Sequence, residues 1–118
     1  MERTSSINIG GQSYSLLLTT RATKEIARRF GGLTNLGDKL SNTENFEEAL
    51  DDLIWLIVTL ANQSIMIENL KGANKKLLTA EEVELLTVPS DLGEYKDAIA
   101  NALINGTKRF VESEPEKN

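Results

Sequence analysis

Residues 42–70 read NTENFEEALDDLIWLIVTLANQSIMIENL, and this pattern predicts one long helix at the centre of the fold. In its first third, apolar residues recur at helical spacing between acidic ones. Residues 53–61 are then apolar on every side except at Thr59, so either protein or lipid must surround them. Lipid is the weaker interpretation, because this run is far shorter than the roughly 20 residues that span a bilayer. We therefore expect a core helix that buries Trp55 and is covered by the other segments, with no membrane contact.

The composition is that of an ordinary globular domain. The chain has 118 residues, of which 40% are hydrophobic and 26% charged, so it is long enough to bury a core as a single domain. It contains neither cysteine nor histidine, which excludes thiol chemistry, the commonest general base and the commonest transition-metal ligand. The first residues lack the apolar segment of a secretory signal, which predicts a cytosolic protein. We expect no cofactor.

The charge is unevenly distributed along the chain. The net charge is −5, yet residues 1–40 carry an excess of Lys and Arg whereas residues 41–70 contain acids and no Lys or Arg. An acidic protein repels phosphate backbones, so nucleic-acid binding is not expected. The basic and acidic segments can attract each other, either within one chain or between copies.

A β-hairpin and a helix are predicted before the central helix. Ile7 and Ile9 alternate with polar residues, and Gly10-Gly11 supplies a two-residue turn before a return strand over 12–18. A helix then starts near Thr19 or Thr20 and stops at the glycines 31–32, followed by a short helical turn over 33–40. The inward residues of the first helix should be Ala22, Ile26, Ala27 and Phe30.

Two more helices are predicted after the central one, which we expect Asn42 or Thr43 to cap. Residues 71–76 are polar and contain glycine, so they should form a mobile loop. Thr79 and Glu82 form a capping box for the next helix, 88–89 ends it, and Ser90 or Asp91 caps the last one. Residues 112–118 are charged and broken by proline, which predicts a disordered tail. The predicted class is therefore α+β, mainly α: an N-terminal two-stranded β-hairpin packed on four to five helices around the long central helix, in one domain over 1–111.

Four carboxylates near the start of the central helix resemble a metal or catalytic site. Pairs spaced four residues apart can share a hard cation such as magnesium, or act as an acid and a base. The same residues lie in the first turns of the helix, where the helix dipole favours negative charge. We therefore favour a solvated or partner-binding acidic face over a site for chemistry. The residues are Glu47, Glu48, Asp51 and Asp52.

Two other groups are candidates for partner binding. Arg28 and Arg29 lie with Arg21 and Lys24 on one helix face that has no interleaved aromatic residues, which favours an acidic protein partner over nucleic acid. The second group is the triplet 65–67, whose three large apolar side chains cannot all point into one helical groove. Either the segment 77–78 covers them, which we favour, or they contact a partner protein. They are Ile65, Met66 and Ile67.

The order of these segments resembles a known family. A hairpin reading INIGGQSYSLLLTTRATKEI precedes RRFGGLTNLGDKL, an acidic FEEALDDLIWLIVTLANQS helix, LLTAEEVELLTVPSDL and a long final helix. This order, over residues 7–110, is similar to the tail assembly chaperones of long-tailed bacteriophages and prophages of Gram-positive bacteria. The resemblance implies a non-enzymatic protein of the host cytoplasm that binds the tape measure protein, helps to recruit tail tube protein and is absent from the mature virion. We also expect a homo-oligomer. Apolar helix surface that the core does not bury would serve both the binding of the tape measure protein and self-association.

Two other functions stay open at this point. The chain can be a small phage or bacterial regulatory protein that acts through protein or nucleic-acid contacts of the 21–29 face. It can also be a magnesium-dependent enzyme that uses the four carboxylates of the central helix. Both are less favoured than the chaperone, since the ordered resemblance implies a non-enzymatic protein and the lack of histidine and cysteine points the same way.

Overall fold

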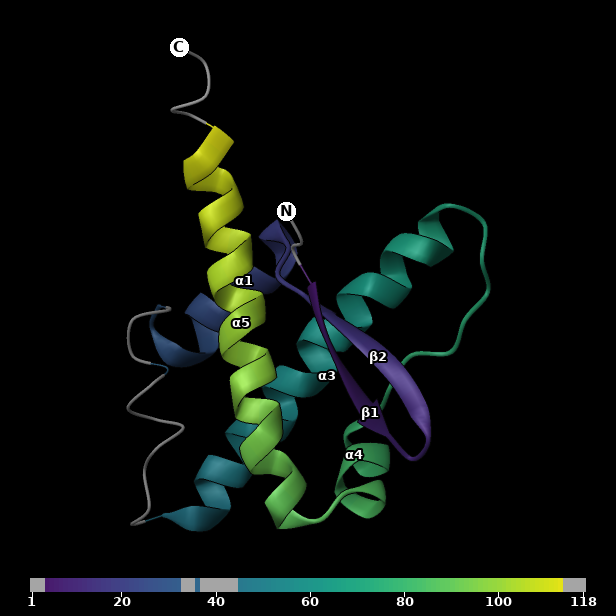
Figure 1. Ribbon diagram of the computed structural model, residues 1–118, viewed down its shortest axis with the longest axis vertical. Coiled ribbons are helices and arrows are strands. Elements are labelled where there is room, and N and C mark those ends of the chain that lie inside the picture. The colour runs from purple at the N-terminus through teal and green to yellow at the C-terminus, as the bar shows by residue number, and fades with distance from the viewer. Residues whose placement is uncertain (1–3, 33–35, 37–44, 114–118) are drawn as a thin grey trace.

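A computed structural model describes residues 4–32, 36 and 45–113, and it confirms the predicted α+β, mainly α class (Figure 1). An antiparallel hairpin comes first, with Gly10 and Gly11 in its turn and Ile7 opposite Tyr14. Four helices follow in the described part of the chain. The elements are β1 (Thr4–Ile9), β2 (Gln12–Leu17), α1 (Thr20–Phe30), α3 (Phe46–Leu70), α4 (Ala80–Leu86) and α5 (Pro89–Ser113). Of the turn predicted over 33–40, only Leu36 is described, and it is buried.

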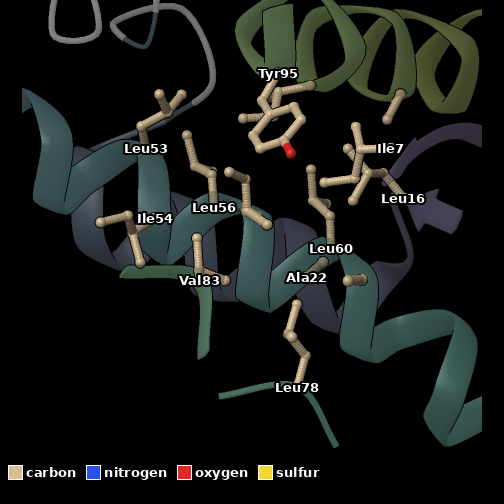
Figure 2. Packing of buried hydrophobic residues seen from close by; sticks show 14 of the residues in the cluster. Ile7, Leu16, Ala22, Leu53, Ile54, Leu56, Leu60, Leu78, Val83 and Tyr95 are labelled. Carbon is tan, nitrogen blue, oxygen red and sulfur yellow. The ribbon is translucent and has the colours of Figure 1, made fainter. Parts of the chain in front are cut away.

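The central helix α3 lies in the middle of the fold and contacts most of the other described elements. It packs against β2, α1, α4 and α5, and its buried side chains form the middle of the core with Leu16, Ala22 and Val83 from those neighbours (Figure 2). Each large apolar side chain buried in this way contributes about 1.5–3 kcal/mol of transfer free energy. The fully or nearly buried residues of α3 are Leu53, Ile54, Leu56, Ile57, Leu60 and Ala61.

By length and composition alone, α3 could cross a membrane, with a mean hydropathy of 1.4 over its most apolar window. In the fold, 56% of that window is buried, and four other elements contact the helix. A core helix of a globular domain has the same composition, because it too must be apolar on most sides. The burial therefore favours the core interpretation.

The structure corrects three details of this region. The helix begins at Phe46, and Asn45 caps it by accepting a hydrogen bond from the Glu48 backbone amide at 3.1 Å, so the cap expected at residues 42–43 was placed too early. Trp55 is half-buried, because it lies at the edge of the core against the Phe30 ring, with ring centroids 5.8 Å apart. Ala27 is exposed, since the inward stripe of α1 repeats every four residues through Ala22, Ile26 and Phe30.

The ends of α4 and α5 follow their capping chemistry. The predicted capping box of Thr79 and Glu82 is present at the start of α4. Pro89 is the first residue of α5, a position where its missing N–H costs no helical hydrogen bond, so the cap expected at Ser90 or Asp91 was placed too late. Asp91 lies inside the first turn, where its carboxylate accepts from the Val88 amide at 3.1 Å. The last helix continues to Ser113, so the tail predicted from residue 112 begins too early. Residues 114–118 lie outside the described residues.

Helix α5 is fastened to the hairpin by contacts far apart in sequence. The Tyr95 hydroxyl donates to the Asn8 carbonyl, and the Ser5 hydroxyl donates to the Ala98 carbonyl at 2.6 Å. Further along α5, Gly106 faces Leu18, and a Cβ added to the glycine would lie 2.9 Å from the Leu18 Cβ. The absence of a side chain at Gly106 therefore allows the close approach of α5 to the end of the hairpin.

The connection between α3 and α4 is held by two asparagine side chains of α3. Asn62 is buried, and its side chain donates to the Leu78 carbonyl at 2.9 Å and accepts from the Leu78 amide at 2.8 Å. Asn69 forms the same pair of bonds with the backbone of Lys75, at 3.1 and 2.8 Å. The connection is thus tied to α3 at Lys75, inside the segment 71–76 that was predicted as a mobile loop, and at Leu78, just after it.

The two glycines of α5 should respond in opposite ways to substitution by alanine. Gly93→Ala should raise the free energy of unfolding by about 0.5–1 kcal/mol, because alanine favours the helix and nothing lies within 4 Å of the new Cβ. Gly106→Ala should lower it by about 1–2 kcal/mol, since the contact with Leu18 forces a shift in packing. Urea unfolding followed by circular dichroism measures both; equal effects would contradict the close approach at Gly106.

Asn62→Ala should lower the free energy of unfolding by about 1–3 kcal/mol, because it leaves the Leu78 amide and carbonyl without their partner. The connection should also open, so limited trypsin digestion should cut faster after Lys75 and Lys76. Asn101→Ala is the matched control, as Asn101 is exposed on α5. Unchanged digestion in Asn62→Ala would show that the asparagine does not hold the connection.

Candidate functional site

The fold separates Asp52 from the other three carboxylates of the predicted acidic site. Glu47 and Asp51 are exposed, and Glu48 accepts a hydrogen bond from the Asn45 side chain at 3.0 Å. Asp52 is only 7% exposed and faces into the fold, which corrects its assignment to a solvated or partner-binding face. Within the described residues, no three Asp, Glu, His or Cys side chains are placed to hold a metal ion.

Asp52 and Arg29 form an ion pair that joins α1 to α3. The Arg29 Nη2 lies 3.0 Å from the Asp52 Oδ1, and the guanidinium carbon lies 4.9 Å from the centroid of the Trp55 ring. It also lies 5.6 Å from the centroid of the Phe30 ring. The basic and acidic segments were predicted to attract each other, and the Arg29–Asp52 pair is an intramolecular case of this attraction. Arg28 remains exposed on the outer face of α1.

The apolar triplet at the far end of α3 is half-exposed rather than covered. Ile65 is half-buried and lines a pocket together with Leu77, so cover of the triplet by the segment 77–78 stays a prediction. Met66 and Ile67 instead line an open groove of about 480 Å³ together with Leu70, which is 87% exposed. We call this groove the α3 C-terminal surface. Its remaining lining residues are Thr19, Arg21, Gln63 and Asn69.

The α3 C-terminal surface is built from two elements that a polar network holds together. The Thr19 hydroxyl, which caps α1 by accepting from the Ala22 amide at 3.0 Å, donates to the Gln63 side-chain oxygen. Gln63 is 4% exposed and donates in turn to the Thr59 carbonyl at 3.0 Å. Across the groove, the Arg21 Nη1 lies 3.6 Å from the Met66 sulfur. The start of α1 is therefore fixed as one wall of the groove.

The sequence did not single out four residues of this surface, Thr19, Gln63, Asn69 and Leu70. Leu70 could have been found, because it lies four residues after Met66 and three after Ile67, on the same helix face. Thr19 and Gln63 gave no such signal, since only the packing of α1 on α3 brings them together.

The two tyrosines, which are weak acid candidates in any small domain, are structural here. Burial raises the pKa of Tyr95 above its ordinary value, and the nearby Asp91 and Glu94 raise it further. Burial also raises the pKa of Tyr14, with a smaller contribution from Glu82. Both phenols stay protonated near neutral pH, and that of Tyr95 is used as a hydrogen-bond donor to β1.

Arg29→Ala should lower the free energy of unfolding by about 1–2 kcal/mol, because Asp52 would stay buried without its partner, while the partial exposure of Arg29 limits the loss. Arg29→Lys should recover only part of this, since lysine keeps the charge but not the planar contact with Trp55. Arg28→Ala is the control and should change stability by less than about 0.5 kcal/mol. Chemical denaturation of the three variants measures these differences, and equal values for Arg28→Ala and Arg29→Ala would contradict the pair's role.

No protein-family model, no curated protein and no solved structure matches this chain. The resemblance to tail assembly chaperones thus rests on the ordered sequence pattern, and what it implies stays a prediction. The geometry by itself gives a helical α+β domain whose central helix ends in an open apolar groove.

Proposed function

We propose that this chain is a non-enzymatic phage tail assembly chaperone that binds helical segments of the tape measure protein and assists tail tube assembly. The observation that carries the proposal is the α3 C-terminal surface. There, Met66 and Ile67 are half-exposed and Leu70 is 87% exposed, along an open groove of about 480 Å³. Contiguous exposed apolar side chains with a polar rim are typical of surfaces that bind other proteins.

The shape of this surface favours a helix as its ligand. Met66, Ile67 and Leu70 follow one another along one side of α3, and such a ridge packs into the groove of a second helix. Met66 is unbranched and adapts to different neighbours, which suits a protein that must bind several segments of one long partner. Arg21 at the rim has further guanidinium N–H groups that can donate to polar side chains on the partner's flank.

The side-chain inventory supports binding rather than catalysis. The chain has neither histidine nor cysteine, Asp52 is engaged with Arg29, and the described carboxylates do not converge on a metal site. The regulatory alternative is less well supported, because Arg29 of the basic face is paired with Asp52. A host-cytoplasm location and absence from the mature virion belong to the same proposal.

Co-expression with the tape measure protein of the same tail gene cluster tests the proposal. The wild-type chain should co-purify with it and raise its soluble fraction. Ile67→Glu/Leu70→Glu should reduce the captured amount by about tenfold, since charges replace the apolar ridge. The control is Ile104→Glu, because Ile104 is also an exposed apolar residue, 58% accessible, but lies on α5.

The two ways in which this experiment can fail are distinct. If the wild-type chain neither binds nor solubilises the tape measure protein, the chaperone function is wrong. If the wild-type chain binds it and the double variant binds equally well, the function stands and the assignment to the α3 C-terminal surface is wrong.

A further inference from the structure

A second apolar groove lies at the opposite end of α3, where its first turns meet the corner between α4 and α5. It has a volume of about 360 Å³ and is separate from the α3 C-terminal surface. One wall comes from α3 and the other from α4 and the start of α5. We call it the α3 N-terminal groove. Its apolar lining residues are Phe46, Leu50, Ile54, Val88, Pro89 and Leu92.

The fold leaves this groove open above a buried floor. Ile54 and Leu92 belong to the core, whereas Phe46 is 60% and Val88 55% exposed. Phe46 is the first residue of α3, so it precedes the part of the helix that the other elements cover. Val88 lies at the corner before Pro89, which is already part of α5. A single exposed apolar residue is ordinary, but two that flank an apolar floor form a continuous surface for another molecule.

The charges around the groove have one sign. Glu47 and Asp51 stand on the α3 side and Glu84 on the α4 side, and all three are exposed. None of them forms an ion pair with a described residue, and no Lys or Arg is among the described residues that line the groove. An apolar floor between two acidic walls is complementary to a ligand that is apolar along its centre and basic along both edges.

We infer that the α3 N-terminal groove binds a basic amphipathic helix of a partner protein. The apolar ridge of that helix fills the floor between Phe46 and Val88, while Lys or Arg residues on its flanks pair with Glu47, Asp51 and Glu84. This is the helix-in-groove mode of recognition, in which apolar anchors supply affinity and the flanking charges set orientation and selectivity. Because the groove lies at the other end of α3, it can bind or fail to bind independently of the proposed function.

A second copy of this chain is a poor occupant. Its basic helix is α1, which carries Arg21, Lys24 and Arg28 on its outer face. The apolar stripe of α1, however, is buried in its own core. That helix therefore has no apolar ridge to place between Phe46 and Val88 of another molecule, so the ligand must come from a different protein.

Fluorescence anisotropy with labelled synthetic peptides tests the inference on the full chain. The first probe is a peptide of about 18 residues, or five helical turns, with leucine along one face and lysine on both flanks. A second peptide replaces every lysine with glutamate, and a third replaces every leucine with serine. The lysine–leucine peptide should bind at least about tenfold more tightly than either comparison peptide, and its affinity should fall as salt is raised.

Paired variants assign the binding to the groove. Phe46→Ala/Val88→Ala should lower the affinity for the lysine–leucine peptide by about tenfold. Leu85→Ala, which removes a more exposed leucine outside the groove, should leave this affinity unchanged. Glu47→Gln/Asp51→Asn/Glu84→Gln should weaken it by about fivefold and flatten its salt dependence. The control Glu81→Gln/Glu94→Gln/Asp97→Asn changes the net charge equally, at exposed positions outside the groove. It should keep both the affinity for the peptide and its salt dependence. Circular dichroism shows whether each variant is folded.

Three results would overturn the inference. These results are that the glutamate peptide binds as tightly as the lysine–leucine peptide, that the groove variants behave like their controls, or that Ile67→Glu/Leu70→Glu weakens peptide binding. Sedimentation of the free chain tests the alternative occupant, a second copy of this chain. If the chain self-associates and Phe46→Ala/Val88→Ala abolishes this, the groove is a contact between copies. Tape measure capture by the groove variants is read separately and bears on the proposed function alone.

Discussion

The middle of α3 is apolar on nearly every side, and the rest of the fold follows from the need to cover it. A helix with one apolar stripe needs one neighbour, whereas residues 53–61 need neighbours all round. The hairpin, α1, α4 and α5 supply them, and Leu56, Ile57 and Leu60 are consequently inaccessible to solvent. The described elements cover the middle of the helix more fully than its two ends. The open grooves at those ends are thus a consequence of how a short chain encloses a long helix.

Polar side chains hold these covering elements in place at particular points. Arg29 reaches from α1 to Asp52, Asn62 holds the connection before α4, and Tyr95 joins α5 to β1. Each contact satisfies a polar group that burial would otherwise leave unpaired, which would cost about 1–3 kcal/mol. The same contacts withdraw groups from chemistry: a carboxylate paired with arginine and a phenol bonded to a carbonyl are structural residues. In this fold Asp52 and Tyr95 thus connect neighbouring elements.

Local sequence patterns predicted most of the fold and little of the surface. The glycine pair of the hairpin turn, the Thr79–Glu82 capping box and the apolar run of α3 act over a few residues, so the sequence alone defines them. The burial of Asp52 depends on Arg29 and Trp55 arriving from different positions on the chain, which no local pattern specifies. The same holds for the groove walls, since Phe46 and Val88 are adjacent only after α4 and α5 fold back on α3. Element types are local properties, and surfaces are tertiary ones.

The bonds between Ser5 and Ala98, and between Asn8 and Tyr95, have a consequence for the order in which the molecule is made. The hairpin is synthesised before the helix that covers it, which follows on the order of ten seconds later at ordinary elongation rates. Until then a two-stranded hairpin is marginally stable in water, and one side of the nascent apolar helix lies bare. The hairpin can therefore reach its native contacts only after α5 has been synthesised, and until then the nascent chain exposes apolar surface that the finished fold buries.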